Sequence, residues 1–487
     1  MSLNVAQLVV ERARLRPASP AIITHNQVIT YGRLGVSIGV VASHLREQGV
    51  TPGQVVGISM GQNPLHVITL LALAQIGAVS LPLHIAVPQN RRALAAQRFG
   101  ATSVVSGRDD MALAGLQFIS LAKLSFDGSS IPPDSEIYQV NPDTPFRIAI
   151  SSGTSGDPKG MLITHGVMVS RNRRPEPGFT LQSRSIPMDL NFIAGFRPAM
   201  SALAMGASVV LPRLMNPEQL LHAVVSHNVT HISLSPAQAH ELAEQFAIKG
   251  IHCPGLVCLR IVGGPLAPQQ LEVLRRTVSP NVYVTYGSTE SGVVAFAAPD
   301  VLERQPTSVG QVLDWAQIEV VDREGHPLPT GEAGLLRIRS EDQVSGYYND
   351  AERNHKHFRD GWFYSGDLGR FDEEGLLYIE GRVDEQLNVG GFKVNPDDID
   401  AVLVAHPNVA EAGSFVLVRE EGAELLAAAV VLRDGNSIDD IRSHARTQLG
   451  PLAPTAYFIA KSLPRTITGK LRRGELSAQF ASHEHLH

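Results

Sequence analysis

The stretch FRIAISSGTSGDPKG (146–160) joins an apolar, strand-like run to a loop of glycine and hydroxyl residues. Glycines let a backbone approach an anion, and successive amides and hydroxyls can surround phosphate oxygens. Lys159 adds a positive charge, while the spacing and Pro158 exclude a Walker A loop. A plain structural turn is the alternative. We predict a phosphate-binding loop made of Ser151, Ser152, Gly153, Thr154, Ser155 and Gly156, followed by Lys159.

Apolar runs like the one before this loop recur through the first half of the chain. They alternate with helix-length segments such as 34–49 and 217–228, which indicates an α/β architecture with largely parallel sheets. Ligands of such folds bind beyond the carboxyl ends of strands. Three polar motifs lie at such ends. The predicted strands are 55–60, 78–83, 102–106, 146–151, 207–212, 230–235, 259–264 and 282–287.

The pattern changes from about residue 306, where short strands and turns predict a β-rich subdomain that closes the large domain. After Arg382 the chain reads as a compact α+β unit with helices over 396–407 and 437–449. The polar segment GRVDEQ (381–386), which joins the large domain to this unit, indicates a short hinge near Asp384 and no flexible linker. We predict an α/β fold with a large domain over 1–381 and a small domain over 382–487.

Composition narrows the class of protein. The formal net charge of −6 disfavours a nucleic-acid coat, and two cysteines in 487 residues exclude a disulfide framework and fit a reducing cytoplasm. Cys253 and Cys258 lack a second ligand pair, so we expect no metal site there. Charges near the N-terminus argue against a signal peptide. The apolar stretch 67–83 predicts a buried helix and strand instead of a membrane span.

The phosphate loop and several later motifs together resemble the acyl-adenylate-forming superfamily, which comprises acyl- and aryl-CoA synthetases, adenylation domains and firefly-type luciferases. The resemblance runs from ITYGRL (29–34) to TGKLRR (468–473). It implies that ATP and Mg²⁺ activate a small carboxylic acid as acyl-AMP. It further implies transfer of the acyl group to coenzyme A, or to the phosphopantetheine of an acyl carrier protein, with a mobile small domain that rotates between the two steps.

The resemblance also implies roles for individual residues. Tyr286 stacks on adenine, Thr289 contacts the α-phosphate and Glu290 binds magnesium, in the motif YGSTE (286–290). Asp367, in SGDLG (365–369), and Arg382 hold the ribose. The remaining nucleotide-side residues of the family pattern are Gly263, Gly264, Pro265 and Gly287.

Three further positions of the family pattern lie in the C-terminal part. Asp384 matches the hinge about which the small domain rotates, and Gly391 belongs to the loop 390–393 that enters the site for the thiol step. Lys470, in the frame PRTITGK, matches the lysine of adenylation. The predicted catalytic set is therefore Lys470, Glu290, Thr289 and Lys159.

The acid pocket is expected from the stretches 192–197, 231–238, 261–265 and 286–294, with Phe192, Ile193 and Ser288 among its residues. Their small and apolar residues suit an aryl or medium aliphatic acid. Ile193 occupies the position at which amino-acid-activating members carry an aspartate, although Asp189 lies nearby. Arg171, Arg173 and Arg174 are interpreted as a solvated surface run, with contact to coenzyme A phosphates or a carrier protein as the alternative.

Alternative functions share these motifs. Phosphopantetheine is the thiol of both coenzyme A and carrier proteins, so a carrier-loading enzyme would look alike. A luciferase-like oxidase is a third possibility. A catalytically inactive adenylate-binding regulatory protein belongs to another class, and the intact set Lys159, Glu290, Asp367, Arg382 and Lys470 argues against it.

Overall fold

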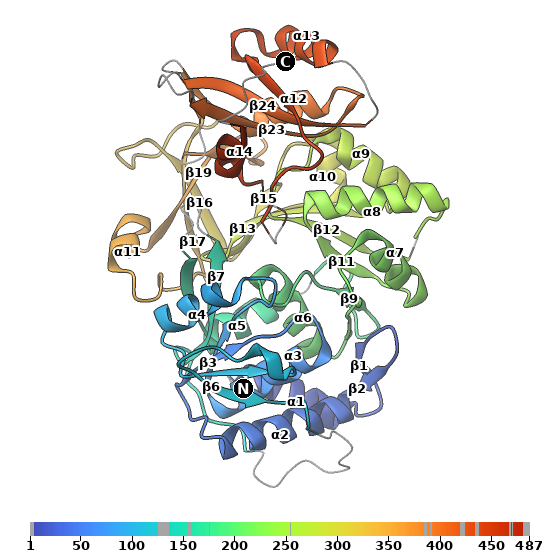
Figure 1. Cartoon of the computed structure of the whole chain (residues 1–487), viewed down its shortest axis with the longest axis vertical. Coiled ribbons are helices and arrows are strands. Elements are labelled where there is room, and N and C mark those ends of the chain that lie inside the picture. The colour runs from blue at the N-terminus through green and yellow to red at the C-terminus, as the bar shows by residue number, and fades with distance from the viewer. Residues whose placement is uncertain are drawn as a thin grey trace.

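The computed structural model describes residues 4–124, 136–152, 158–174, 176–253, 255–383, 387–389, 392–418, 424–433, 438–466, 469 and 471–480. The chain forms an elongated molecule (Figure 1) in which two large sheets lie in the N-terminal part and a smaller unit caps the opposite end. This arrangement confirms the predicted α/β class.

The six-stranded sheet carries the phosphate-loop motif. Its order is β6-β5-β3-β4-β7-β8, and all of its pairs are parallel except the last. Residues 153–157 therefore connect the antiparallel strands β7 and β8, in which Ser151 is paired with Lys159. The strands are β3 (Val55–Ile58), β4 (Val79–Pro82), β5 (Ser103–Ser106), β6 (Gln117–Ser120), β7 (Pro145–Ser152) and β8 (Pro158–Thr164).

The nine-stranded sheet has the order β15-β14-β13-β12-β11-β9-β10-β1-β2 and is parallel at its centre and antiparallel at both edges. Its strands are β1 (Pro20–Ile23), β2 (Val28–Thr30), β9 (Arg184–Ile186), β10 (Ser208–Val210), β11 (His231–Leu234), β12 (Cys258–Val262), β13 (Val282–Ser288), β14 (Gly292–Ala297) and β15 (Gln311–Val312).

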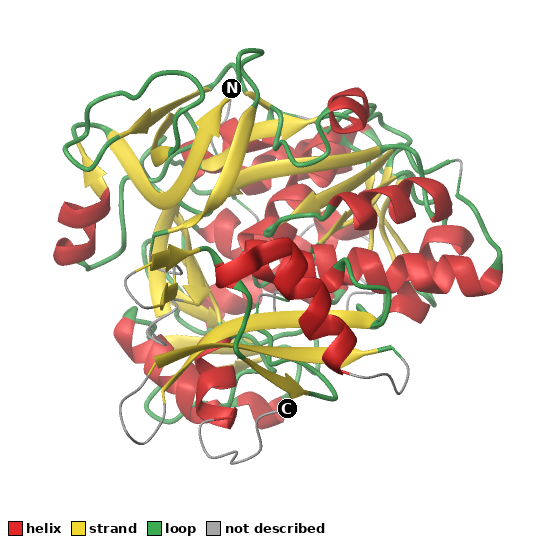
Figure 2. Cartoon of the chain, turned by 90° about the horizontal axis from the view of Figure 1, so that it is seen from above, coloured by secondary structure: helices red, strands yellow, loops and turns green. Residues whose placement is uncertain are grey.

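Helices fill the faces of the two sheets (Figure 2). One core joins the first helices to both sheets, and a second packs β11 and β12 against α8 and α9. The stretch 67–83 is the buried end of α3 followed by β4, as predicted. The helices are α1 (Val5–Leu15), α2 (Tyr31–Glu47), α3 (Pro64–Ile76), α4 (Gln89–Arg98), α5 (His165–Asn172), α6 (Ile193–Met205), α7 (Pro217–Ser226), α8 (Pro236–Lys249), α9 (Pro268–Thr277) and α10 (Pro299–Arg304).

The predicted β-rich subdomain is a five-stranded antiparallel sheet with one short helix, α11 (Ala351–His357). Its apolar side packs against the β14 end of the nine-stranded sheet through residues such as Val294 and Leu336. This contact brings β19 and β20 close to β13. The strands are β16 (Ala316–Val321), β17 (Gly334–Ser340), β18 (Phe358–Arg359), β19 (Trp362–Phe371) and β20 (Leu377–Arg382).

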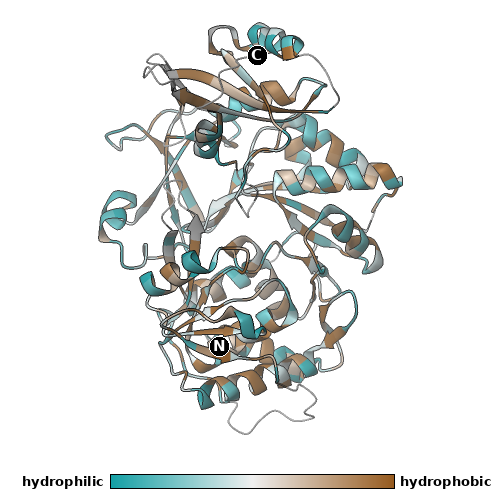
Figure 3. Ribbon diagram, viewed as in Figure 1, coloured by the Kyte–Doolittle hydropathy of each residue, from teal (hydrophilic) through white to brown (hydrophobic). Residues whose placement is uncertain are grey.

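The C-terminal unit is built around the three-stranded sheet β23-β24-β25. Figure 3 shows hydrophobic colour along β23 and β24. In the large N-terminal part, by contrast, hydrophobic and hydrophilic residues alternate around the helix α8. The elements are β21 (Leu387–Val389), β22 (Phe392–Val394), α12 (Pro396–Val404), β23 (Val409–Val418), β24 (Glu424–Leu432), α13 (Ile438–Leu449), β25 (Ala456–Ile459) and α14 (Arg473–Phe480).

One strand extends beyond what the sequence indicates. Asp367 lies inside β19, although SGDLG (365–369) reads as a turn between two strand-like runs. β19 extends because it pairs with its antiparallel neighbour β20, whereas β13, expected over 282–287, ends as predicted to within one residue. Such pairing depends on partners far along the chain and leaves little local signal. Among the described residues, no helix is both long and apolar enough to cross a membrane.

Candidate active site

Three predicted nucleotide-binding residues, here called the nucleotide side, meet between β13, β19 and β20. The Tyr286 hydroxyl donates a hydrogen bond to Asp367 Oδ2 at 2.5 Å, and Arg382 Nη1 donates to Asp367 Oδ1 at 3.1 Å. Asp367 and Arg382 are paired residues of the β19–β20 ladder. Burial and the neighbouring Asp367 raise the pKa of Tyr286 well above its ordinary value, so the phenol stays a donor.

Glycines of the nucleotide motifs occupy positions that a side chain would disturb. Gly263, at the exposed end of β12 beside Gly264 and Pro265, has a φ of +88°, which favours glycine. A Cβ on Gly287 would lie 2.1 Å from the carbonyl oxygen of Gly292. The close approach of β13 and β14 at this point therefore requires glycine, which sets the turn that carries Thr289 and Glu290.

Glu290 and Lys159 face a tyrosine that the sequence reasoning did not identify. Tyr347 donates its hydroxyl proton to Glu290 Oε1 at 2.9 Å, and Lys159 Nζ lies 5.9 Å from the centre of its ring. The backbone of Val344 also donates to the Glu290 carbonyl at 2.8 Å. Burial, and then Glu290, raise the pKa of Tyr347. The glycine and aromatic residues of SGYYND (345–350) are the sequence signal that could have indicated this contact.

The interpretation of residues 171–174 as a solvated run is wrong for two of its arginines. Arg171 is 3% exposed and donates from Nη2 to the carbonyl oxygens of Thr289 (3.0 Å) and Asp342 (2.7 Å). Arg174 forms an ion pair with Asp342 at 2.6 Å and stacks 4.2 Å from the Trp315 ring centre. Arg173 is exposed, as expected. Arg171 thus holds the Thr289 turn through a hydrogen bond to its backbone, and this role depends on a contact between residues far apart in the sequence.

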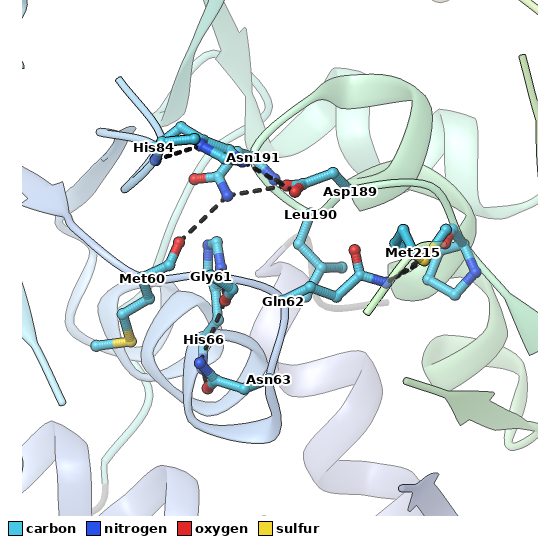
Figure 4. Close-up of polar contacts among 12 residues, drawn as sticks. Met60, Gly61, Gln62, Asn63, His66, His84, Asp189, Leu190, Asn191 and Met215 are labelled. Carbon is cyan, nitrogen blue, oxygen red and sulfur yellow. Dashed lines mark hydrogen bonds and ion pairs between the residues drawn. The ribbon is translucent and has the colours of Figure 1, made fainter. Parts of the chain in front are cut away.

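The predicted acid residues, here called the acid side, begin at the N-terminus of α6. Phe192 is the residue before α6, Ile193 is its first residue, and the His84 ring lies 6.0 Å from the Phe192 ring. Figure 4 shows the polar contacts beside them, from the loop after β3 to the segment before α6. Ser288, at the end of β13, hydrogen-bonds with Ser291 across the turn.

Asp189 is fully engaged within this group. His84 accepts from the Ala86 amide at Nδ1 (2.9 Å), so its Nε2 carries the proton and donates to Asp189 Oδ2 at 3.0 Å. Asn191 donates twice to Asp189 Oδ1, at 2.8 and 2.9 Å. Burial raises the pKa of Asp189, but the contacts with His84 and Asn191 outweigh it and leave the pKa below its ordinary value. Asp189 already has partners for both oxygens, which disfavours it as the partner of a substrate ammonium.

Seven predicted residues lie outside the described residues: Gly153, Thr154, Ser155, Gly156, Asp384, Gly391 and Lys470. Ser151 and Ser152 are described only as backbone of β7. Residues on both sides of position 470 have defined contacts. A Cβ on Gly469 would lie 3.1 Å from Ser235 Oγ, at the N-terminus of α8, and Arg465 donates to the Gly469 carbonyl at 2.9 Å. Arg473 pairs with Asp400 at 2.7 Å.

The chemical types of the side chains around Glu290 fit a nucleotide bound with magnesium. Within the described ranges no group of three or more metal-ligating side chains occurs, so Glu290 would be a single protein ligand. Mg²⁺ in nucleotide sites commonly uses one or two carboxylates and takes its other ligands from phosphate oxygens and water. An aromatic ring, a carboxylate with an arginine, and a lysine line the same region, as adenine, ribose and phosphate require.

The comparisons with known proteins agree with this geometry. The family model AMP-binding enzyme matches residues 9–348, and the model AMP-binding enzyme C-terminal domain matches residues 398–470. The chain belongs to the AMP-binding, adenylate-forming enzymes.

Individual relatives cover nearly the whole chain. Indoleacetate–CoA ligase of Aromatoleum aromaticum is 29% identical over 97% of this chain and 98% of its own length. The amide bond synthetase McbA of Marinactinospora thermotolerans has a TM-score of 0.87 at 26% identity, with 98% and 99% of the two chains covered. The o-succinylbenzoate CoA synthetase MenE of Bacillus subtilis, in complex with OSB-AMP, has a TM-score of 0.86 at 25% identity, with 96% and 97% covered.

Proposed function

We propose that this protein uses ATP and Mg²⁺ to convert a carboxylic acid into an acyl-adenylate and then transfers the acyl group to coenzyme A. The observation that carries the proposal is the meeting of Tyr286, Asp367 and Arg382 from three strands, next to Glu290 and Lys159. Residues from four separate stretches of the chain form one site with the donors that a nucleotide requires. MenE, solved with ATP and a magnesium ion, supports the same choice of nucleotide and metal.

In the first step a carboxylate oxygen of the acid attacks the α-phosphorus of ATP. The new P–O bond forms as the bond to the β-phosphate oxygen breaks, and pyrophosphate leaves. The chain's own contribution is to position the reactants and neutralise charge, since no protein nucleophile is needed. Lys159 and Lys470 provide positive charge, Thr289 contacts the α-phosphate, and the backbone of 151–156 surrounds the phosphates.

Magnesium, when bound, would neutralise charge on the phosphate oxygens. Glu290 is the residue that would hold it. Tyr347 orients this carboxylate through the hydrogen bond at 2.9 Å, and the amide of Val344 fixes the backbone on the same turn. Tyr347 therefore acts as a positioning residue for Glu290.

In the second step the thiol sulfur of coenzyme A attacks the acyl carbon; the C–S bond forms as the C–O bond to AMP breaks, and AMP and the thiol proton are released. The thiol and Lys470 compete for one place, so we propose that the small domain (382–487) rotates against the large domain (1–381) about Asp384. The loop with Gly391 then replaces Lys470 in the site. A carrier protein remains the alternative thiol, and a catalytically inactive regulatory protein remains the alternative of another class.

A second acceptor class is favoured by one observation. McbA, an amide bond synthetase, resembles this chain over 98% of its length. An amine attacking the same acyl-adenylate would form an amide and release AMP without any thiol. Adenylation is common to both candidates, so the acceptor has to be tested separately.

The experiment measures ATP-dependent pyrophosphate release over a panel of aliphatic, aryl and amino acids, with hydroxylamine as the trap for the acyl group. Lys470→Ala is the inactive control. Release with one acid class, lost in Lys470→Ala, supports adenylation. Coenzyme A, carrier protein and amines are then compared as acceptors. Absence of release with every acid, from folded protein that binds ATP, would contradict the proposal and favour the regulatory alternative.

A further inference from the structure

Two arginines lie close to each other at the acid side, although the stretches predicted to form the acid pocket are mostly apolar. Arg197 is on α6, four residues after Ile193, so both residues lie on one face of the helix. Arg260 is on β12, in register with Ser233 of β11. The neighbouring strand residues Ile232 and Leu259 belong to the core under α8 and α9, so Ser233 and Arg260 face the opposite side of the sheet.

One carboxylate lies between the two guanidinium groups. Glu176 Oε1 is 2.8 Å from Arg260 Nη1 and 3.9 Å from Arg197 Nη1. All three side chains are withdrawn from solvent, with exposures of 5% for Arg260, 9% for Glu176 and 14% for Arg197. This group, here called the Arg197–Arg260 group, carries two positive charges against one negative charge.

The hydrogen-bonding capacity of this group is only partly used. Arg197 donates from Nη2 to the carbonyl oxygens of Arg171 (3.3 Å) and Arg174 (2.8 Å), and in the described part of the chain its Nε has no acceptor. Within the same residues, Arg260 Nε, Ser233 Oγ and both oxygens of Glu176 are buried without a hydrogen-bond partner, although Glu176 Oε1 forms the ion pair with Arg260. Buried donors without acceptors are costly, so a ligand that supplies acceptors would be stabilised here.

Electrostatics favours an anion over a neutral acceptor. Burial lowers the pKa of Arg197 to about 10; the charge of Arg260 acts in the same direction, and Glu176 and Asp342 oppose it. Among the described residues, Glu176 is the only carboxylate in ion-pair contact with either guanidinium group, so the Arg197–Arg260 group keeps one uncompensated positive charge. A second carboxylate would restore neutrality and accept hydrogen bonds from a planar fork of donors.

We infer that the acid substrate is a dicarboxylic acid, whose second carboxylate binds to Arg197, Arg260 and Ser233 while the first is activated. The inference rests on the proposed function and names its substrate class. It adds a second carboxylate to the aryl or medium aliphatic acid expected from the sequence. Ile193 and Arg197 are four residues apart on α6, about 6 Å along its axis, so the test uses diacids whose carboxylates are separated by a few carbons or by one ring.

The test compares matched acids on the wild-type enzyme and on Arg197→Met. Each dicarboxylic acid is paired with its monocarboxylic counterpart and its monomethyl ester, for example glutaric with pentanoic acid and terephthalic with 4-methylbenzoic acid. The measurement is kcat/KM for pyrophosphate release. The matched control is Arg184→Met, because Arg184 is a partly buried arginine of β9 that donates to the His227 carbonyl.

We expect the wild type to prefer a dicarboxylic acid, and Arg197→Met to lower kcat/KM for that acid roughly 10-fold to 100-fold through KM. The kcat/KM for the monocarboxylic counterpart should change less than about threefold, since a methionine fills a volume similar to that of an arginine. Arg184→Met should leave the ratio between the two acids unchanged.

Three outcomes would overturn the inference while adenylation itself stands. The first is a wild type that prefers the monocarboxylic acid. The second is a methyl ester that serves as well as the diacid, which would indicate that a neutral group binds there. The third is an Arg197→Met variant with equally lowered kcat/KM for both acids, which would assign Arg197 to the reacting carboxylate or to the fold. Absence of pyrophosphate release with every acid would instead contradict the proposed function. These results are therefore distinguishable.

Discussion

The nucleotide side and the acid side of the site are built in different ways. On the nucleotide side, Tyr286 and Arg382 each donate to a separate oxygen of Asp367. On the acid side, Arg260 Nε and Ser233 Oγ are buried without partners among the described residues. The first region is held in shape by its own side chains before any ligand binds, and the second leaves donors for a ligand. Under the proposed function, the first region binds the nucleotide and the second selects the acid.

The largest effect on the nucleotide side is expected from Asp367→Ala. Removing the carboxylate takes away a predicted ribose ligand and also leaves Tyr286 and Arg382 without their shared acceptor. We expect kcat/KM for ATP to fall roughly 100-fold to 1,000-fold, mostly through KM. Glu380→Gln, on the partner strand β20, is the matched control. An unchanged KM for ATP would contradict the assignment.

Acidification should destabilise the fold through two buried histidines. Burial, then the charge of Arg147, lowers the pKa of His66 to about 4, and burial lowers the pKa of His165 to about 4. Within the described residues the Nε2 atoms of both rings have no partner. Because the native pKa lies below the unfolded one, stability is complete above about pH 6.5 and is lost as the pH falls toward 4, by up to about 3 kcal/mol per histidine.

The measurement is the free energy of unfolding by denaturant at pH 7 and at pH 4.5. His66→Asn with His165→Asn keeps a donor to the Gly61 carbonyl and an acceptor for the Val5 amide, contacts that the rings make at 3.1 and 3.2 Å. The double variant should lose less stability between the two pH values than the wild type. His326→Asn, at an exposed histidine, is the control. Equal losses would refute the explanation.

Arg171→Met tests whether the support behind the Thr289 turn matters for chemistry. The variant loses the hydrogen bonds to the carbonyls of Thr289 and Asp342, and we expect a fall of roughly 10-fold to 30-fold in kcat/KM for pyrophosphate release. Arg173→Met, at the exposed neighbour, should have little effect. If thermal stability fell while the kinetics of the folded fraction stayed the same, Arg171 would be structural only.

The smallest expected effect is that of Tyr347→Phe. It removes the hydroxyl that orients Glu290 and leaves the ring near Lys159 in place. We expect about a fivefold decrease in kcat/KM, largest at low Mg²⁺, which corresponds to one hydrogen bond. Tyr348→Phe is the matched control, since its ring packs near Phe99. A decrease that does not depend on Mg²⁺ concentration would argue against the positioning role.

Much of the fold was predictable because its signals are local. The eight strands expected in the first half all occur, since each is a short apolar run bounded by turn residues. The α/β class and the β-rich subdomain followed from the same patterns. The extent of β19 was missed because its antiparallel partner β20 extends it, and the contacts of Arg171 and Arg174 were missed because charge normally indicates a solvated surface.

The sequence by itself determined the family and predicted the nucleotide-side residues, because glycine, hydroxyl and carboxylate groups in fixed order carry their chemistry within a few residues. Only the tertiary structure decided which distant side chains support them. It placed Tyr347 beside Glu290 and Arg171 behind Thr289. It also enclosed Glu176 between Arg197 and Arg260, three residues up to 84 positions apart. Charge balance inside a protein depends on burial and distance, and neither is encoded in local sequence.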